Sequence, residues 1–197
     1  MIRINKFTNS KGILKLDQIL NKRRNIQNNN ISVVSKILKD IKKNKNKALI
    51  KYEKKFSNNR SIKPSIREIN KAIRSLNPII KKAIDYAYNR IFKFHSLQKM
   101  QNINYRDKLN NKFHYRSLPI KKVGVYVPAN LPSTLLMNAI PAKIAGVKKI
   151  ILANPRLNKK LNPAVIYAAK KLGIEDIYSI GGAQAIGSLT YIQKVDK

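Results

Sequence analysis

One stretch decides the fold: KKVGVYVPANLPSTLLMNAIPAKIAGVKKIILANP, residues 121–155. It contains a β-rich run at residues 123–127, a helix-like segment at residues 133–147 and a second β-rich run at residues 149–153. Each β-rich run is short, strongly apolar and followed by a proline, which predicts a strand buried inside a sheet. A strand, a helix and a second strand predict a βαβ crossover with two parallel strands.

The pattern continues toward the C-terminus. Asn162-Pro163 predicts a helix start, because asparagine caps helices and proline fits the first helical position, and Gly173 predicts its end. A third strand is expected at residues 174–180, followed by a helix at residues 183–191. Three strands that alternate with helices predict half of a doubly wound parallel sheet. Such sheets bind ligands at the carboxyl ends of their strands, so we expect a site in the loops that follow them.

Upstream of this region the chain reads as helical. Residues 21–30 are polar and without periodicity, which predicts a loop or a mobile arm. Between Ile31 and Phe56, apolar residues recur at helical spacing on either side of a Lys/Asn run, which predicts two helices or one bent helix. Ser65 and Glu68 match a capping box, and Pro78 predicts the start of another helix. We therefore expect two parts: a helical lobe at residues 1–105 and half of a parallel-sheet domain at residues 106–197.

Composition limits the classes of function. The 197 residues include 42 Lys and Arg, 9 Asp and Glu, and no cysteine, so disulfides, thiolate metal sites and cysteine nucleophiles are excluded. The net charge of +33 is accompanied by many asparagines and isoleucines, as expected of a genome rich in A and T, so it is weak evidence for a polyanionic partner. No run approaches the roughly 20 apolar residues of a membrane span, and no secretory signal is evident. A cytoplasmic location is the expectation.

The candidate site residues lie at predicted strand ends. The Gly181-Gly182 pair opens a helix, where free backbone amides bind phosphate or carboxylate; a tight turn is the alternative. Tyr126 faces either the ligand or the core. Ser133-Thr134 more simply predicts a helix cap than a substrate contact. His95 and His114 each lack companions at metal-binding spacing, so neither predicts a zinc site.

Three blocks of sequence closely resemble histidinol dehydrogenase: VGVYVP at residues 123–128, STLLMNAIPAKIAGV at residues 133–147 and GGAQAI at residues 181–186. The helical lobe is similar to that family too, at residues 47–56 and 94–99. The resemblance implies an α/β fold in which a Rossmann-like parallel sheet, here partial (βαβαβ), follows a mainly helical N-terminal lobe. Residues 106–197 would be the first half of its NAD-binding domain.

The resemblance also implies a function. Histidinol dehydrogenases are NAD-dependent, zinc-requiring homodimers that oxidise L-histidinol through histidinaldehyde to L-histidine, the last steps of histidine biosynthesis. Their NAD-binding positions match Tyr126 and Gln184 here, which we expect at the tips of neighbouring strands. The resemblance assigns no catalytic residue and no metal ligand to this chain, because those of the family lie in the half that this N-terminal half lacks.

The expected partners are therefore L-histidinol and either a second copy of the chain or a complementing C-terminal half, with no specific nucleic acid and no membrane. Two alternatives stay open. One is a non-catalytic remnant or interaction module that binds nucleotide without turnover. The other is a basic nucleic-acid-binding protein, for which affinity would fall steeply with salt.

Overall fold

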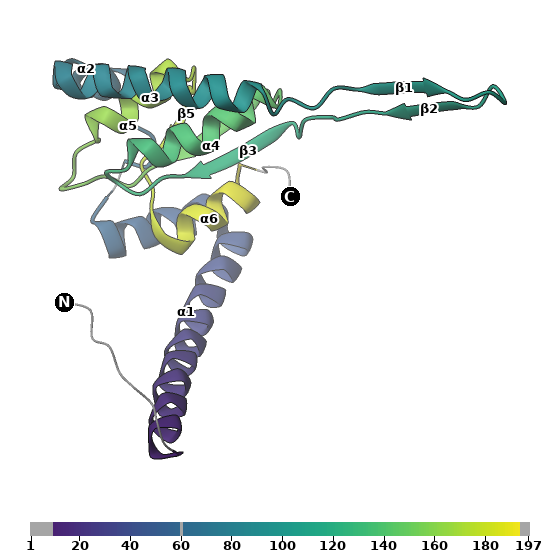
Figure 1. Ribbon diagram of the computed structural model, residues 1–197. Coiled ribbons are helices and arrows are strands. Elements are labelled where there is room, and N and C mark those ends of the chain that lie inside the picture. The colour runs from purple at the N-terminus through teal and green to yellow at the C-terminus, as the bar shows by residue number, and fades with distance from the viewer. Residues whose placement is uncertain (1–9, 60, 194–197) are drawn as a thin grey trace.

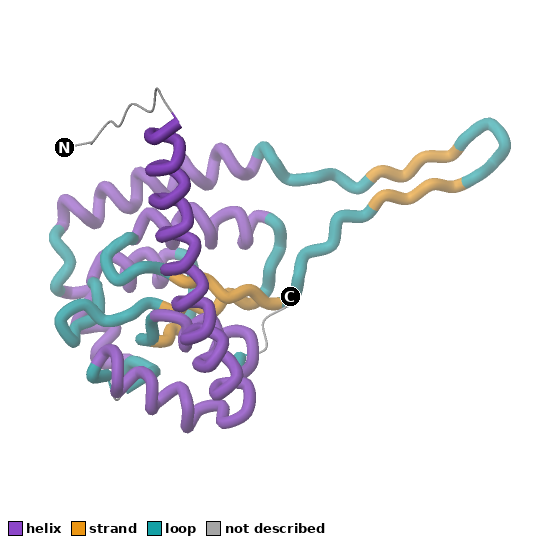
Figure 2. The backbone as a smooth tube through the Cα atoms, turned by 90° about the horizontal axis from the view of Figure 1, so that it is seen from below, coloured by secondary structure: helices purple, strands orange, loops and turns teal. Residues whose placement is uncertain are grey.

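A parallel three-stranded sheet forms the centre of the protein. The computed structural model describes residues 10–59 and 61–193, with the side chains of residues 10, 11 and 22–30 left aside. The strands run in the order β3 (Lys122–Tyr126), β4 (Lys149–Ala153) and β5 (Asp176–Tyr178), all parallel. The crossovers contain α4 (Pro132–Ile144) and α5 (Pro163–Lys171), and α6 (Gly182–Tyr191) follows β5 (Figures 1 and 2). The predicted α/β fold with a βαβαβ sheet is confirmed.

Both faces of the sheet are buried. Along β4, Ile150 and Leu152 belong to one apolar core, whereas Ile151 and Ala153 belong to another on the opposite face. This split follows from the two-residue period of a strand. It also explains why β4 is an uninterrupted apolar run, as in parallel sheets that helices cover on both sides.

The N-terminal helices cover both faces rather than one. Helices α2 (Ile66–Arg74) and α3 (Pro78–Ser96) pack on the side of α4 and α5, whereas the later part of α1 (Ser10–Ser57) packs with α6 on the other side (Figure 1). Gly187 permits the close approach of α6 to α1, because a Cβ at this position would lie 3.0 Å from Leu38.

Helix α1 differs from the prediction in its first half. Residues 21–30 continue the helix, so the predicted loop is wrong. The prediction of two helices or one bent helix for residues 31–56 is confirmed: Lys45 has non-helical angles (φ 49°, ψ −127°) at a kink that joins two helical parts, and α1 changes direction along its length (Figure 1). Backbone hydrogen bonding within a helix does not require apolar periodicity, which explains how a polar run remains helical.

Three of the four predicted helix starts are confirmed, two of them with the predicted cap residue and one with the predicted proline. Ser65 forms the predicted capping box with Glu68, Asn77 caps α3 before Pro78, and Asn162 caps α5. The predicted cap at Ser133-Thr134 is wrong. Pro132 occupies the first turn of α4, which moves the N-cap to Leu131, a residue whose side chain forms no capping bond.

A β-hairpin projects from the body between α3 and β3. It consists of β1 (Ile103–Arg106) and β2 (Lys112–Tyr115), antiparallel, with every residue exposed (Figure 1). The predicted boundary between residues 105 and 106 falls inside β1, and the division into two domains stays a prediction. Among the described helices, none is long and apolar enough to cross a membrane.

Candidate functional site

The carboxyl ends of the three strands are tied together by one asparagine. The Asn154 backbone N–H donates to the carbonyl oxygen of Tyr178 at 2.9 Å, and its side-chain Nδ2 donates to the carbonyl oxygens of Val127 and Pro128, each at 3.0 Å. Asn154 is 1% exposed. Its position directly after a strand was the only sequence signal for this role. The bonds fix the spacing of the strand ends around the expected ligand site.

Tyr126 lies at the end of β3 on the α1/α6 face of the sheet. Alternation assigns the face, because Val125 belongs to the core on the other side and Gly124 points toward Leu189 of α6. Tyr126 is half-buried and packs against the core that α1 and α6 share. Its ring therefore contributes to that core, as one of the two predictions has it, although the residue is not fully buried.

The turn from β5 into α6 holds the second predicted residue. Gly182 has φ +60°, a conformation that favours glycine, and a Cβ there would lie 2.9 Å from Oε1 of Gln184. Gly182 therefore serves two purposes: it allows the turn and leaves room for the Gln184 amide. Gln184 is only 3% exposed.

A buried carboxylate on α1 holds this turn. Oε1 of Glu53 accepts hydrogen bonds from the Gly181 backbone N–H at 3.0 Å and from Nε2 of Gln184 at 2.9 Å. Glu53 is 1% exposed. Sequence reasoning missed it, because Glu53 sits 128 residues before Gly181 in a run of charged residues that resembles the solvated face of a helix.

Tyr126 and Gln184 share one face of the sheet at its carboxyl edge, because Glu53 of α1 contacts Gln184 and Tyr126 packs against the α1/α6 core. The prediction that they lie at the tips of neighbouring strands is wrong, because β4 lies between β3 and β5. A ligand that contacts both residues would span the end of β4.

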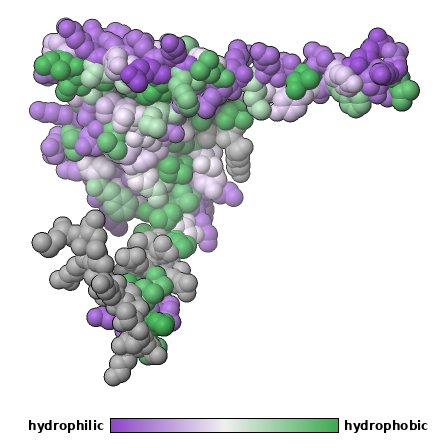
Figure 3. Space-filling view, in the orientation of Figure 1, coloured by the Kyte–Doolittle hydropathy of each residue, from purple (hydrophilic) through white to green (hydrophobic). Residues whose placement is uncertain are grey.

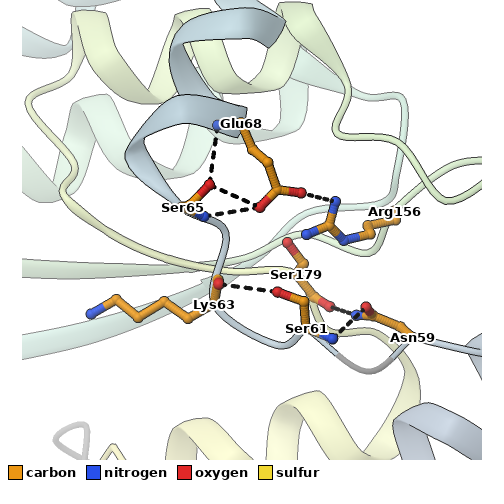
Figure 4. Close-up of polar contacts among 7 residues, drawn as sticks. All are labelled: Asn59, Ser61, Lys63, Ser65, Glu68, Arg156 and Ser179. Carbon is orange, nitrogen blue, oxygen red and sulfur yellow. Dashed lines mark hydrogen bonds and ion pairs between the residues drawn. The ribbon is translucent and has the colours of Figure 1, made fainter.

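A second polar group lies beside the ends of β4 and β5 (Figure 4). Asn59 donates to the carbonyl oxygen of Ser179 at 2.6 Å, and Nη1 of Arg156 donates to Oε1 of Glu68 at 2.9 Å. The backbone hydrogen bond from Ser65, followed by the contact with Arg156, holds the pKa of Glu68 below its usual value.

This polar group borders a cleft of about 640 Å³ whose lining includes Asn59, Ser61, Glu68, Arg156 and Lys159. Three polar groups at this edge are buried without a protein partner: Asn154 Oδ1, Ser179 Oγ, and the Nε and Nη2 atoms of Arg156. Buried polar groups are usually hydrogen-bonded, so their concentration at one sheet edge is typical of a site that binds a polar molecule or ordered water. Tyr126 and Gln184 do not line this cleft.

The described residues do not fit a zinc ion. No three His, Asp or Glu side chains in residues 10–59 and 61–193 come together as a metal site. Each of the two histidines contacts an amide side chain: Nδ1 of His95 contacts Gln98 at 2.6 Å, and Nδ1 of His114 contacts Asn104 at 2.7 Å. Asp176 pairs with Lys149 at 2.8 Å.

A largely apolar groove of about 730 Å³ lies between α1 and the end of α6. Its lining includes Ile31, Val34, Leu38 and Tyr191. Exposed apolar residues continue along the first part of α1 and on the hairpin, where the hydropathy surface shows apolar patches (Figure 3). These surfaces are separate from the carboxyl edge of the sheet.

Comparison with known proteins agrees with the arrangement of the fold. The family model described as histidinol dehydrogenase matches residues 20–197. Histidinol dehydrogenase of Pelagibacter ubique is 54% identical over the whole chain, and that of Campylobacter jejuni is 42% identical over 84% of it. The crystal structure of histidinol dehydrogenase from Elizabethkingia anophelis superposes with a TM-score of 0.77 at 37% identity over 84% of the chain.

The chain spans less than half the length of these proteins: 48% of the Pelagibacter protein and 40% of the Elizabethkingia chain. The matched part includes both the helices and the parallel sheet, because the family model extends from residue 20 to residue 197. The chain therefore belongs to the histidinol dehydrogenase family.

Proposed function

We propose that this chain supplies part of the NAD site of a histidinol dehydrogenase, with Tyr126 and Gln184 as its cofactor-binding residues. The reaction would be the oxidation of L-histidinol through histidinaldehyde to L-histidine, at the end of histidine biosynthesis in the cytoplasm. NAD, when bound, accepts a hydride. The residues of this chain bind and orient the nucleotide.

One observation supports the proposal most strongly. Gln184 is buried at the first turn of α6 and oriented by Glu53, on the same sheet face as Tyr126. An amide held in this way presents a fixed hydrogen-bonding group at the carboxyl edge, where open parallel sheets bind nucleotides.

The proposal assigns neither proton-transfer groups nor zinc ligands to this chain. Zinc and the catalytic acid and base would come from a complementing C-terminal half, equivalent to the remaining part of the relatives, because a second copy of this chain would only repeat the same residues. The apolar groove between α1 and α6 and the exposed hairpin support a polypeptide partner, since apolar patches of this kind mark protein interfaces.

The test measures NAD binding by isothermal titration calorimetry. Gln184→Ala should weaken binding about tenfold and Tyr126→Phe about fivefold, since each change removes one hydrogen bond of about 1 kcal/mol. Gln98→Ala and Tyr105→Phe serve as matched controls, because both residues are exposed and lie away from the carboxyl edge. Unchanged affinity in both site variants would contradict the assignment.

The same preparations test whether the catalytic groups lie outside this chain. With NAD, Zn²⁺ and L-histidinol, the chain alone should form no NADH. Sustained NADH formation by the purified chain would show that the catalytic groups lie within it and would overturn this part of the proposal.

A further inference from the structure

The sequence leaves two interpretations of the Gly181-Gly182 turn, a loop that binds an anion or a tight turn, and in the structure its first amide binds a side chain of the protein itself. The Gly181 N–H, at the N-cap of α6, donates to Oε1 of Glu53 at 3.0 Å. A helix N-terminus attracts negative charge because its N–H groups and its dipole are oriented toward the ligand. Glu53 already provides that charge, and it is buried.

The same carboxylate fixes the orientation of the Gln184 amide. Nε2 of the Gln184 amide faces Glu53 and donates to its Oε1 at 2.9 Å. The carbonyl oxygen Oε1 is consequently turned away from Glu53 and toward Gly182, whose missing Cβ leaves it room. Gln184 thus presents an acceptor beside the turn.

We infer that Glu53 is a positioning residue that makes the α6 end of the site selective: it excludes phosphate from the turn and presents Gln184 Oε1 to a neutral group that carries a hydrogen-bond donor, such as a hydroxyl or an amide. The inference deepens the proposed function and rests on it for the identity of the nucleotide. Within NAD, it assigns a ribose hydroxyl or the carboxamide, and not the pyrophosphate, to this turn.

Two substitutions separate the effect of the Glu53 charge from the effect of its geometry. Glu53→Gln keeps the shape but replaces the carboxyl group by a neutral amide, a weaker acceptor for both donors that does not repel an added anion. Glu53→Ala removes the acceptor as well, which releases the Gly181 N–H and the Gln184 amide. Glu175→Gln is the matched control, because Glu175 is exposed, precedes β5 at the opposite edge of the sheet, and gives the same change in net charge.

The experiment uses inorganic pyrophosphate and NAD as probes and follows the Gly181 backbone and Gln184 side-chain amides by ¹⁵N NMR at physiological salt. Pyrophosphate should leave the Gly181 amide of the unmodified chain and of Glu175→Gln unmoved. It should shift that amide in Glu53→Gln, with at least tenfold tighter binding there. Glu53→Ala should weaken NAD binding about tenfold and broaden or shift the Gln184 amide signals.

The outcomes separate this inference from the proposed function. If NAD does not bind the unmodified chain, the proposed function fails, and the pyrophosphate response still decides the role of Glu53. An equal response of Gly181 to pyrophosphate in the unmodified chain and in Glu53→Gln overturns the inference, as does an equal gain in Glu175→Gln. Should Glu53→Ala not fold, Glu53→Gln alone gives the decision.

Discussion

Asp85 is a carboxylate that joins α3 to α5. It accepts hydrogen bonds from the Tyr167 hydroxyl at 2.8 Å and from Nζ of Lys171 at 2.7 Å. The bond from Lys171 is the largest cause that lowers the pKa of Asp85, and burial followed by the bond to Asp85 raises the pKa of Tyr167 to about 12. Both shifts couple the packing of α5 against α3 to pH.

Asp85→Asn should lower the free energy of unfolding by about 1 to 2 kcal/mol near neutral pH, because the two hydrogen bonds from Tyr167 and Lys171 lose their charged acceptor. The folded pKa of Asp85 is lower than its unfolded value of 3.8, so its stabilisation exists above that pH and is lost as the pH falls. The folded pKa of Tyr167 is raised from 10.0 to about 12, so its stabilisation exists below pH 10 and is lost between these values.

Urea unfolding across the pH range checks both signs. Asp85→Asn should reduce the pH dependence at the acid and alkaline ends, whereas Tyr167→Phe should reduce it mainly at the alkaline end, because Lys171 still lowers the pKa of Asp85. A Tyr167→Phe profile that matches the unmodified chain above about pH 10 would contradict the coupling.

The residues of the site differ in how far sequence identifies them. Tyr126 and Gln184 were assigned only through the resemblance to histidinol dehydrogenase, whereas the tight turn at Gly182 is predictable from glycine itself, which adopts a positive φ without strain. Glu53 is not predictable, because its partners lie 128 and 131 residues away and only the packing of α1 on α6 brings them together. Buried polar partners that come from distant helices carry no local signature.

At the scale of elements, the bend in α1 allows the parts of the helix before and after the bend to pack against the same core. Ile37 and Ile41 precede the bend, Leu49 and Tyr52 follow it, and all four are buried in the α1/α6 core. Lys45 at the bend has φ 49°, a conformation that is strained for a residue with a side chain.

Lys45→Gly should therefore raise the free energy of unfolding by about 1 kcal/mol, because glycine adopts this conformation without strain. Lys39→Gly, at an exposed position inside the helical part, should lower it by about 1 kcal/mol, the ordinary cost of glycine in a helix. Thermal and urea unfolding measure both. A loss of stability in Lys45→Gly as large as in Lys39→Gly would contradict the assignment of strain.

Elements were predictable where the signal is local. The caps at Ser65 and Asn162 were found because a cap depends on residues within one turn. The helix at residues 21–30 was not predicted, because its polar composition lacks the apolar stripe from which helices are inferred. The start of α4 was misplaced by one residue, since the preference of proline for the first turn outweighs that of serine and threonine for the cap.

At the scale of the molecule, the hairpin exposes an apolar face. The register pairs Ile103 with Tyr115 and Tyr105 with Phe113, so these four side chains share one side, while Asn104 and His114 pair on the other. All four apolar residues are exposed, and the hairpin extends away from the body (Figures 1 and 2). In the sheet, β3 and β5 each have one side unpaired by any described strand. Unpaired edges and exposed apolar faces favour association between chains.

Tyr105→Thr combined with Phe113→Thr should therefore reduce concentration-dependent association of the isolated chain, measured by sedimentation velocity, at least severalfold at moderate salt. Moderate salt is needed because a net charge of +33 opposes contact between copies at low ionic strength. Asn104→Thr with His114→Thr is the matched control, since it changes the same two strands on the polar side and should leave association unchanged. Sedimentation of the unmodified chain that is independent of concentration would contradict the role of the apolar face, and an equal reduction by the control pair would assign association to the strands as a whole.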